Sequence, residues 1–292
     1  MLLQHFINAL SMGSVYALIA VGYNMVFGVL GKLNHAHGDL YTFGCFVAYT
    51  LMTANVNPYL AILIGVLVGG ALNFLAERFA YRPLRSGSRL AALMAAIGIA
   101  YIIRNLVQII WGPQTYSFSL SGIVPTGSIT AGNYVIGKLQ IFILIIAVVI
   151  MAALILFLKV SKWGQAITAI SQDITASVLM GIPSDTVVSV VYIIGGALGV
   201  LGGILFCGYY SYIHMGIGFA YGTMKAWEAG VIGGIGSIKG AVIGALILGF
   251  AETFVAAYIS PAWKDLLVWA LFIGFVMVKP KGLFPVQGAE KI

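Results

Sequence analysis

The stretch LQIFILIIAVVIMAALILFL, residues 139–158, determines the class of fold. Only Gln140 among these residues is polar. About 20 residues of α-helix span roughly 30 Å, which matches the hydrocarbon core of a bilayer. A helix on the surface of a soluble protein carries a polar face, and this stretch has none. It therefore predicts a helix that crosses a membrane.

The rest of the chain has the same composition. Of its 292 residues, 61% are hydrophobic and 8% are charged, with a mean hydropathy of +1.04. Soluble domains carry roughly 25% charged residues, so this composition argues against a water-soluble globule. Apolar stretches separated by short polar loops run from Phe6 to Val278. We expect one transmembrane domain over residues 1–292 with no soluble domain attached.

Nine apolar segments are candidates for spans. Leu40–Ala54, Met224–Ile238 and Leu266–Val278 are short for a full span. In transporters, short glycine-rich segments often form broken or re-entrant helices beside the transport path. The predicted fold class is therefore an all-α polytopic membrane protein with eight or nine transmembrane or re-entrant helices. The other six segments are Phe6–Leu30, Tyr59–Phe79, Ala91–Trp111, Leu139–Leu158, Thr186–Gly208 and Ala241–Ile259.

Basic residues predict the orientation. They gather in residues 78–89, in residues 159–162 and at the C-terminus. Lysine and arginine favour the cytoplasmic side, so residues 81–90, residues 159–185 and the C-terminal tail are predicted to be cytoplasmic. Three spans before Tyr81 place the N-terminus outside, although a re-entrant second segment would reverse this. The clusters lie beside apolar spans, so we expect contact with membrane lipid and none with nucleic acid.

The sequence gives little support for an enzyme. The string Gly233–Gly240 lacks the glycine and lysine spacing of a phosphate-binding loop. Four histidines and eight acidic residues form no metal-binding or nucleophile pattern, so we expect no catalytic residue, metal or cofactor. Cys45 and Cys207 lie in apolar runs and are expected to be buried in helix packing.

The first polar cluster lies between two apolar segments. It consists of Asn34, His35, His37, Gly38 and Asp39, and it is flanked by no long loop. Polar groups at a helix break either satisfy the freed backbone amides or line a transport path. In the first case Asp39 is the N-cap of the next helix. Histidines two residues apart do not share a helix face, which argues against a helical metal site.

The second polar cluster contains Lys225, Trp227 and Glu228. Lys225 and Glu228 are three residues apart and are predicted to pair on one helix face. Ionisable residues inside spans are often functional, but a lysine near a membrane edge is also an ordinary anchor. Both interpretations stay open for this cluster. Glu252 is expected deeper in its span as a packing or pathway residue, and Arg104 is expected to be an interfacial anchor.

A third segment, residues 163–181, has the pattern of an amphipathic helix. Gly181 and Pro183 predict its end, and Ser184 or Asp185 is expected to cap the next span. Such a helix either docks a soluble partner or rests on lipid headgroups. Four apolar residues recur at helical spacing along it: Ile167, Ile170, Ile174 and Val178.

Glycines recur at four-residue spacing in several spans, for example at Gly65 and Gly69. This spacing lets helix backbones approach closely in lipid, either within one chain or between two copies. The two halves also show a weak sequence similarity, since the pattern Ala-x-Gly at residues 36–38 recurs at residues 220–222. Duplicated halves are common in transporters.

Taken together, these motifs resemble the H-type permeases of branched-chain amino acid ABC importers. The likeness runs almost from end to end. Five signatures carry it: GSVYALIAVG (Gly13–Gly22), LNHAHGD (Leu33–Asp39), YRPLR (Tyr81–Arg85), the loop Asp173–Gly181, and Lys225–Ala241 with its IGGIGSI core.

The resemblance implies an ABC importer permease fold in a bacterial-type plasma (inner) membrane, with a cytoplasmic C-terminus. It implies a second related permease as partner, with a heterodimer expected and a homodimer as the alternative. It also implies an extracytoplasmic solute-binding protein and two cytoplasmic ATPases that bind and hydrolyse the ATP. The segment at about 159–185 would then hold the coupling helix, with Gly164, Gln165, Ile170, Asp173, Ile174 and Gly181 as coupling residues.

Two departures from the family pattern bear on specificity and docking. Members commonly carry arginine where this chain has Gln165 and Thr168, and glutamate where it has Gln172, so the docking surface is less charged. They also carry a small or hydroxyl residue where Glu228 stands. Branched-chain or related neutral amino acids are the expected substrates. Urea or short-chain amides are the alternative within the family, and an ATPase-independent secondary carrier is the alternative outside it.

Overall fold

The computed structural model describes residues 2–85, 87–124, 127–131 and 134–284. Seven helical segments in these ranges are long and apolar enough to cross a membrane. They are α1 (Leu2–Leu30), α3 (Pro58–Ala76) continued by the π-helical turn η1 (Glu77–Tyr81), α4 (Arg89–Trp111), α5 (Lys138–Val160), α8 (Ser184–Tyr210), α10 (Ile238–Tyr258), and α11 (Lys264–Val278) preceded by the 3₁₀ turn η3 (Pro261–Trp263).

Two further segments enter the bundle without being long enough to span it. The first is α2 (His37–Thr53), and the second is α9 (Lys225–Gly233) continuing from the π-helical segment η2 (Gly218–Met224). The nine segments of the described chain agree with the predicted eight or nine. Met224–Ile238 is not one helix, however, because α9 ends where Gly234 adopts a φ of +109°. Glycine tolerates this conformation, and it turns the chain into α10.

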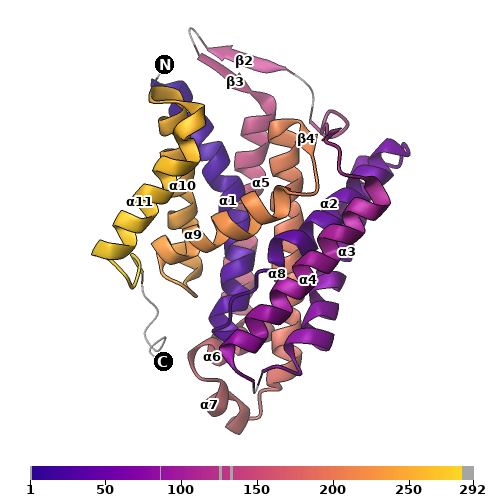
Figure 1. Ribbon diagram of the computed structural model, residues 1–292, viewed down its shortest axis with the longest axis vertical. Helices are drawn as coiled ribbons and strands as arrows, with labels where there is room; N and C mark the ends of the chain where they lie inside the picture. The colour runs from indigo at the N-terminus through magenta and orange to yellow at the C-terminus, as the bar shows by residue number, and fades with distance from the viewer. Residues whose placement is uncertain (1, 86, 125–126, 132–133, 285–292) are drawn as a thin grey trace.

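Strands are confined to two small antiparallel pairs in the described residues. β1 (Tyr116–Ser117) pairs with β4 (Tyr212–Ile213), and β2 (Ser128–Ala131) pairs with β3 (Tyr134–Gly137). The β2–β3 hairpin and the start of α1 lie at one end of the bundle, here called the hairpin end (Figure 1). The short helices α6 (Lys162–Gln172) and α7 (Ile174–Leu179) lie at the other, here called the α6–α7 end.

The core is built around α1 and α8, which are the most buried of the long helices. They approach closely at Gly22 and Gly195. A Cβ on Gly22 would lie 2.6 Å from the carbonyl oxygen of Gly195, and a Cβ on Gly195 would lie 2.8 Å from that of Gly22. Gly65 likewise faces the backbone of Gly44 on α2. The glycine spacing at these positions therefore serves helix packing within the chain.

The helices repeat one arrangement on both sides of this core. α1 packs against α10 as α8 packs against α3, and α2 packs against α3 as α9 packs against α10. In this arrangement α8, α9 and α10 take the places of α1, α2 and α3, which agrees with the weak similarity between the two halves of the sequence. It also brings α2 and η2, which both follow a break in the chain, into contact near the centre.

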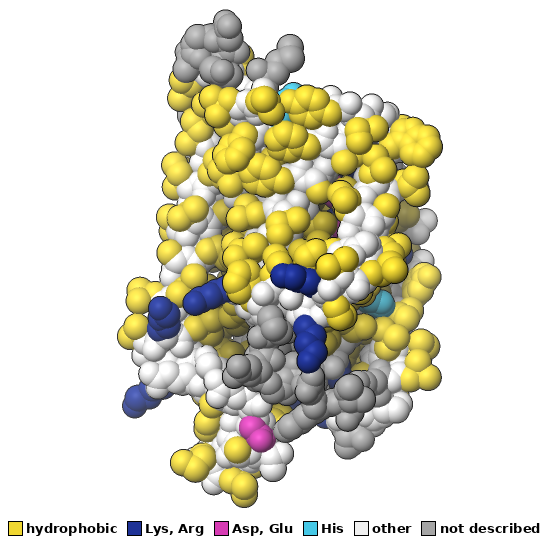
Figure 2. Space-filling model, turned by 90° about the vertical axis from the view of Figure 1, so that its left-hand side faces the viewer, with side chains coloured by type: hydrophobic (Ala, Val, Ile, Leu, Met, Phe, Trp, Pro, Cys, Tyr) yellow, Lys and Arg dark blue, Asp and Glu magenta, His cyan; other side chains and the backbone are white. Residues whose placement is uncertain are grey.

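The surface separates apolar from basic side chains. Hydrophobic side chains cover the upper part of the view in Figure 2, and lysine and arginine side chains gather below them, toward the α6–α7 end. Outward-facing residues of the outer helices are strongly exposed, such as Ile109 at 79%, Val148 at 65% and Leu156 at 62%. Such exposure of apolar side chains is what lipid contact requires.

Candidate functional site

The first polar break is a tight turn between α1 and α2. α1 ends at Leu30, Gly31 takes a φ of +63°, and α2 begins at His37. The Asn34 side chain accepts hydrogen bonds from the Ala36 amide (3.1 Å) and the Tyr81 hydroxyl (2.7 Å). Asn34 therefore holds the turn. The ring of His37 is buried between Tyr23 and Tyr41.

Asp39 and Arg104 form an ion pair that was not predicted. Asp39 is 1% exposed and accepts two hydrogen bonds from the Arg104 guanidinium, at 2.9 and 3.0 Å. The expected N-cap role of Asp39 is wrong, because Ala36 precedes the helix and no side chain caps it. The anchor role of Arg104 is also wrong. The side chain instead points inward, toward Asp39 of α2 and the ring of Phe219, whose centroid lies 5.0 Å from the guanidinium carbon.

The two polar breaks meet in the interior. Thr223 of η2 accepts a hydrogen bond from the Gly38 amide (3.0 Å) and donates one to the His35 carbonyl (3.3 Å). A Cβ on Gly38 would overlap the carbonyl oxygen of Gly218. Glycine at 38 is therefore required for the approach of two non-continuous helices. The structure places the first cluster beside the segment that leads into the second.

The second polar cluster is a buried network of charges, here called the charged cluster: Tyr16, Lys225, Glu228, Glu252 and Lys264. Lys225 Nζ lies 3.3 Å from Glu228 and 2.9 Å from Glu252. The Tyr16 hydroxyl donates to Glu252 at 2.8 Å, and Lys264 Nζ lies 3.5 Å from the same carboxylate. The predicted Lys225–Glu228 pair is confirmed. It is buried inside the protein, which disfavours the interpretation as a surface anchor.

The charged cluster joins four helices, α1, α9, α10 and α11, and its four charges sum to zero. Buried charges are tolerated only when they are paired, and removing one member leaves its partner uncompensated. Trp227 lies beside it on α9 and packs its ring against Trp269 and Phe272 of α11, with centroids 6.4 and 5.2 Å apart. Its position is that of a packing residue between α9 and α11.

We expect Glu228→Gln to change transport while leaving assembly intact. Glutamine keeps the shape of the side chain but removes one of the two carboxylate charges that pair with Lys225. Charged hydrogen bonds contribute about 1.5–3 kcal/mol each, so substrate uptake should change by about tenfold or more. The measurement is initial uptake rate in vesicles beside gel-filtration elution. Asp265→Asn, an exposed acid on α11, is the control. Unchanged kinetics in Glu228→Gln would contradict a pathway role.

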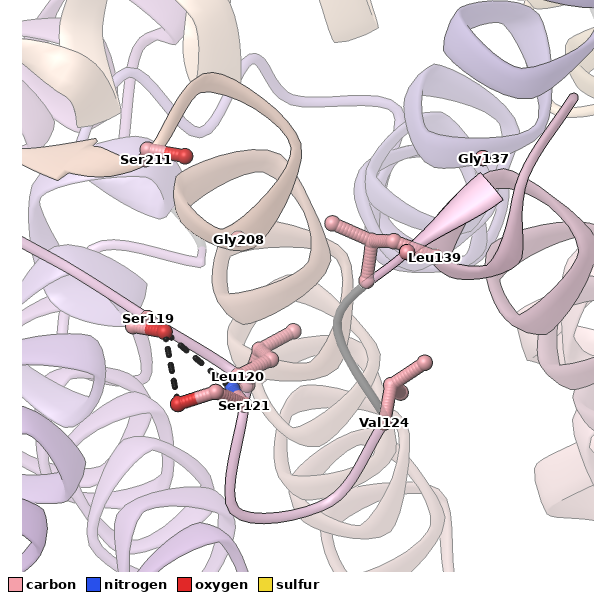
Figure 3. A pocket seen from close by; sticks show the side chains of 9 residues that line it. Ser119, Leu120, Ser121, Val124, Gly137, Leu139, Gly208 and Ser211 are labelled. Atoms are coloured by element: carbon pink, nitrogen blue, oxygen red, sulfur yellow. Dashed lines mark hydrogen bonds between the residues drawn. The ribbon is translucent and has the colours of Figure 1, made fainter. Parts of the chain in front are cut away.

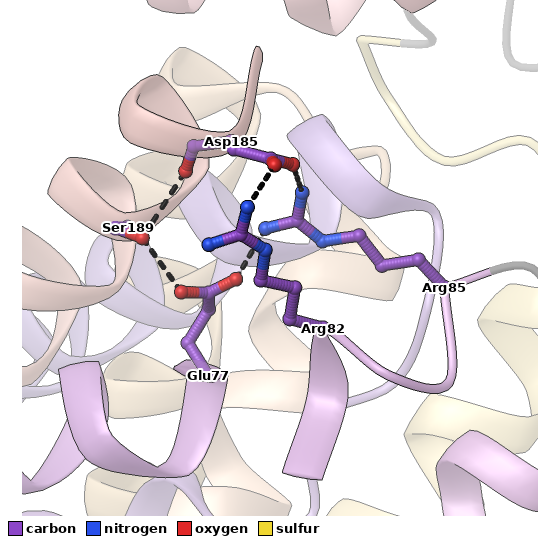
Figure 4. Close-up of polar contacts among 5 residues, drawn as sticks. All are labelled: Glu77, Arg82, Arg85, Asp185 and Ser189. Atoms are coloured by element: carbon purple, nitrogen blue, oxygen red, sulfur yellow. Dashed lines mark hydrogen bonds and ion pairs between the residues drawn. The ribbon is translucent and has the colours of Figure 1, made fainter. Parts of the chain in front are cut away.

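An arginine network ties the α6–α7 end together (Figure 4). Arg82 and Arg85 both contact Asp185, and Arg85 also contacts Glu77, which is fully buried. The Ser189 hydroxyl donates to Glu77 at 2.6 Å. The expected capping role of Ser184 or Asp185 is wrong: no side chain caps α8, and Asp185 binds the two arginines instead. The network links η1 and the loop after it to the first two turns of α8.

The third segment forms two helices rather than one. Asp173 ends α6 and its side chain accepts hydrogen bonds from the Thr175 and Ala176 amides, so a new helix, α7, starts in another direction. This break splits the predicted apolar stripe. Ile167 and Ile170 are buried, whereas Ile174 and Val178 are exposed by 38% and 50%. Gly181 ends the segment with a φ of +83°, as predicted.

The other coupling candidates differ in exposure. Gly164 is buried where α6 folds back on α5, and a Cβ there would overlap the backbone of Leu158. Gln165 is exposed on the outer face of α6. Gly164 and Ile170 thus hold α6 on the bundle, while Gln165 and Ile174 face outward and the half-buried Asp173 caps α7.

A shallow cavity of about 170 Å³ lies at the hairpin end, beneath the β2–β3 hairpin (Figure 3). Its polar groups are the hydroxyls of Ser119, Ser121 and Ser211. Ser119 and Ser121 are hydrogen-bonded to each other at 3.0 Å. No charged residue lines this cavity in the described chain, so it offers nothing that would orient an ionic substrate.

Residues 5–276 match the family described as branched-chain amino acid transport system, permease component. The chain belongs to this permease family. The permease is 36% identical to the high-affinity branched-chain amino acid transport system permease protein LivH of Escherichia coli, over 99% of this chain and 97% of that protein. It is also 36% identical to BraD of Pseudomonas aeruginosa, over 99% and 98% of the two chains.

Solved structures share the fold of the permease. PsaBC from Streptococcus pneumoniae in complex with Fab matches with a TM-score of 0.51 at 13% identity, over 94% of this chain and 91% of that chain. An inward-facing putative metal-chelate type ABC transporter also matches with a TM-score of 0.51, at 14% identity over 94% and 85%. The permease is therefore a multi-pass membrane component with an ABC transporter permease fold, as its motifs predicted.

Sequence reasoning did not find several members of these networks. Tyr16 and Lys264 gave no signal of their own, because tyrosine and interfacial lysine are common in membrane helices. Glu77 was overlooked, although an acid inside the predicted span Tyr59–Phe79 is such a signal. One signal was available for Glu252: a carboxylate deep in a span needs a cation, and Lys225 was the cation in the neighbouring polar break.

Proposed function

We propose that the permease carries branched-chain or related neutral amino acids across a bacterial plasma membrane as one subunit of an ATP-binding-cassette importer. The main supporting observation is that two interrupted helices meet in the interior. There Thr223 of η2 forms hydrogen bonds with both Gly38 and His35 near the start of α2. Irregular backbone at membrane depth is tolerated where protein or a water-filled path covers it. The names of the 36% identical relatives support the substrate class.

The proposed partners are those that the resemblance to ABC importer permeases implies. The sequence shows no phosphate-binding loop pattern, and in this proposal two cytoplasmic ATPases bind and hydrolyse the ATP. The permease itself needs no cofactor and catalyses no reaction. A second related permease completes the path, as a heterodimer or a homodimer, and an extracytoplasmic solute-binding protein delivers the substrate.

The α6–α7 end faces the cytoplasm in this proposal, because lysine and arginine gather there. The C-terminus is then cytoplasmic, and the N-terminus, which lies at the hairpin end, is outside. The solute-binding protein docks at the hairpin end. These assignments agree with three segments, α1, α2 and α3, preceding the basic loop after Tyr81.

The docking surface for an ATPase is the outer face of α7. Leu179 and Met180 are each 83% exposed at its end, and Val178 is 50% exposed. Exposed apolar residues rimmed by polar ones are typical of an interaction site. Movement of α7 would pass to the bundle through Asp185, since this residue follows α7 closely and is held by Arg82 and Arg85. Closure of the ATPases would then open the gap between the two permeases toward the binding protein.

Removing the apolar tip of α7 tests this proposal. We expect Leu179→Asp/Met180→Asp, or deletion of 173–181, to abolish recovery of the ATPases in a pull-down. The double variant buries two charges in the interface without altering contacts inside the permease, since both side chains are exposed. Leu156→Ala/Val160→Ala, on the lipid-facing side of α5, is the control for the loss of two exposed apolar side chains outside α7. ATPase recovery equal to the wild type would refute the coupling role.

Uptake competition separates the alternative substrates. Labelled leucine should be taken up in an ATP-dependent manner, and unlabelled valine and isoleucine should compete while urea and acetamide should not. Competition by urea alone would assign the permease to the amide-transporting branch. Uptake that persists without ATPases would identify a secondary carrier.

A further inference from the structure

A cavity of about 300 Å³ opens at the hairpin end between α1, α8, α10 and α11. This size is at the lower end of small-molecule pockets, which measure roughly 300–1,000 Å³. His5, Asn8 and Thr253 supply polar groups, and Met12, Tyr209 and Ala256 supply apolar surface. The cavity therefore has both polar and apolar walls around a space that fits one small molecule.

Two opposite charges of the charged cluster line this cavity. Glu252 is 5% exposed, and its carboxylate is shared by Lys225, the Tyr16 hydroxyl and Lys264. Lys264 is 18% exposed, and its Nζ is 3.5 Å from Glu252, the longest contact of the carboxylate. Separating Lys264 from Glu252 therefore costs less free energy than breaking any other contact of the cluster, because Lys264 has partial access to water and the weakest contact.

We propose that this cavity binds the ammonium and carboxylate groups of a free α-amino acid by inserting them between Glu252 and Lys264. The ligand ammonium takes the place of Lys264 on Glu252, and the ligand carboxylate binds the released Lys264 ammonium. The apolar wall at Met12, Tyr209 and Ala256 receives the side chain. This inference rests on the proposed transport function and assigns the amino acid a receiving subsite on the outer side.

Charge balance selects the ligand class. Lys225, Lys264, Glu228 and Glu252 sum to zero, and a zwitterion keeps that balance while leaving every charge paired. A simple anion or cation would leave one charge uncompensated in a largely dry site. Urea would separate Glu252 from Lys264 without replacing either charge. The chemistry required is one ammonium and one acidic group, which a phosphatidylethanolamine headgroup also carries.

The test is protection of a cysteine placed in the cavity wall of the full-length permease in phosphatidylcholine nanodiscs. Both native cysteines are buried, so Ala256→Cys gives the labelling signal with a thiosulfonate reagent. We expect leucine to slow this labelling, while isoamylamine, which lacks the carboxylate, and 4-methylpentanoate, which lacks the ammonium, do not. Ser121→Cys, exposed at the same end, is the control that leucine should not protect.

Lys264→Gln in the Ala256→Cys background should raise the leucine concentration for half protection by about tenfold or more, equivalent to 1.4 kcal/mol. Lys138→Gln, which removes the charge of the first residue of α5 at the same end, should leave this concentration unchanged. The analogue comparison needs no Lys264 variant, so it decides the question even if Lys264→Gln does not fold. Equal protection by leucine and either analogue, or none by leucine, overturns the proposal.

Nanodiscs with phosphatidylethanolamine distinguish the two candidate ligands, a free amino acid and a lipid headgroup. If this lipid protects Ala256→Cys and leucine does not, the subsite belongs to a lipid and the amino acid assignment is wrong. Failure of the subsite is also separable from failure of the transport function. A permease that recovers its ATPases and takes up leucine, but shows no protection, retains the proposed function and loses only this subsite.

Discussion

Arg104→Gln should be among the most destabilising single substitutions of a charged residue in this permease. It leaves Asp39, which is 1% exposed, without its two charge-assisted hydrogen bonds. Breaking a buried pair from one side costs about 3–5 kcal/mol. We therefore expect a large drop in melting temperature, measured by fluorescence-detected gel filtration after heating.

A double-mutant cycle separates the pair from general damage at this position. Adding Asp39→Asn to Arg104→Gln should recover a substantial part of the loss, because no buried charge then remains unpaired. Arg82→Gln is the matched control. Its side chain and that of Asp185 are 33% and 49% exposed, so its effect should be below about 1 kcal/mol. Purely additive effects of the two substitutions would show that Asp39 and Arg104 do not stabilise each other.

Gly38→Ala should prevent correct assembly of the two broken helices. The added methyl group would overlap the backbone of Gly218 and the hydroxyl of Thr223, and backbone atoms cannot move aside as a flexible side chain can. Overpacking costs about 1–3 kcal/mol where side chains can adjust, and more is expected here. The measurement is the yield of monodisperse protein and its melting temperature.

Gly98→Ala is the control for this substitution, because nothing lies within 4 Å of a Cβ at that position of α4. Replacing glycine by alanine within a helix is stabilising by roughly 0.5–1 kcal/mol, so the two variants should change stability in opposite directions. A Gly38→Ala protein as stable as Gly98→Ala would mean that α2 and η2 do not approach closely.

Local patterns in the sequence predicted much of the fold. Leu139–Leu158 was recognised as a span, and it lies within α5, because length and apolar content are properties of one segment. The Lys225–Glu228 pair was also predicted, since three residues of helix place both side chains on one face. The end of the third segment at Gly181 followed from the local signal of a glycine with a proline two residues later.

Other features depended on contacts that no local pattern describes. The break of the third segment at Asp173 was missed, because an aspartate inside a helical pattern is compatible with continuation until its side chain is seen to cap the next turn. Local capping was one interpretation of Asp39, beside a pathway role, and Asp185 was one of two expected caps. In the structure both carboxylates bind arginines from another helix or loop.

By itself the sequence determined that the chain is a membrane-embedded helical protein, because burying apolar residues and satisfying every backbone group within lipid leave helices as the solution for such a pattern. Its motifs added the resemblance to a permease family. Only the tertiary structure decided which charges meet. Asp39 pairs with Arg104 across 65 residues, and Glu252 binds Tyr16 across 236. The physical reason is that a pair requires the relative rotation and depth of two helices, and these are set by the packing of the whole bundle at positions such as Gly22, Gly195 and Gly38.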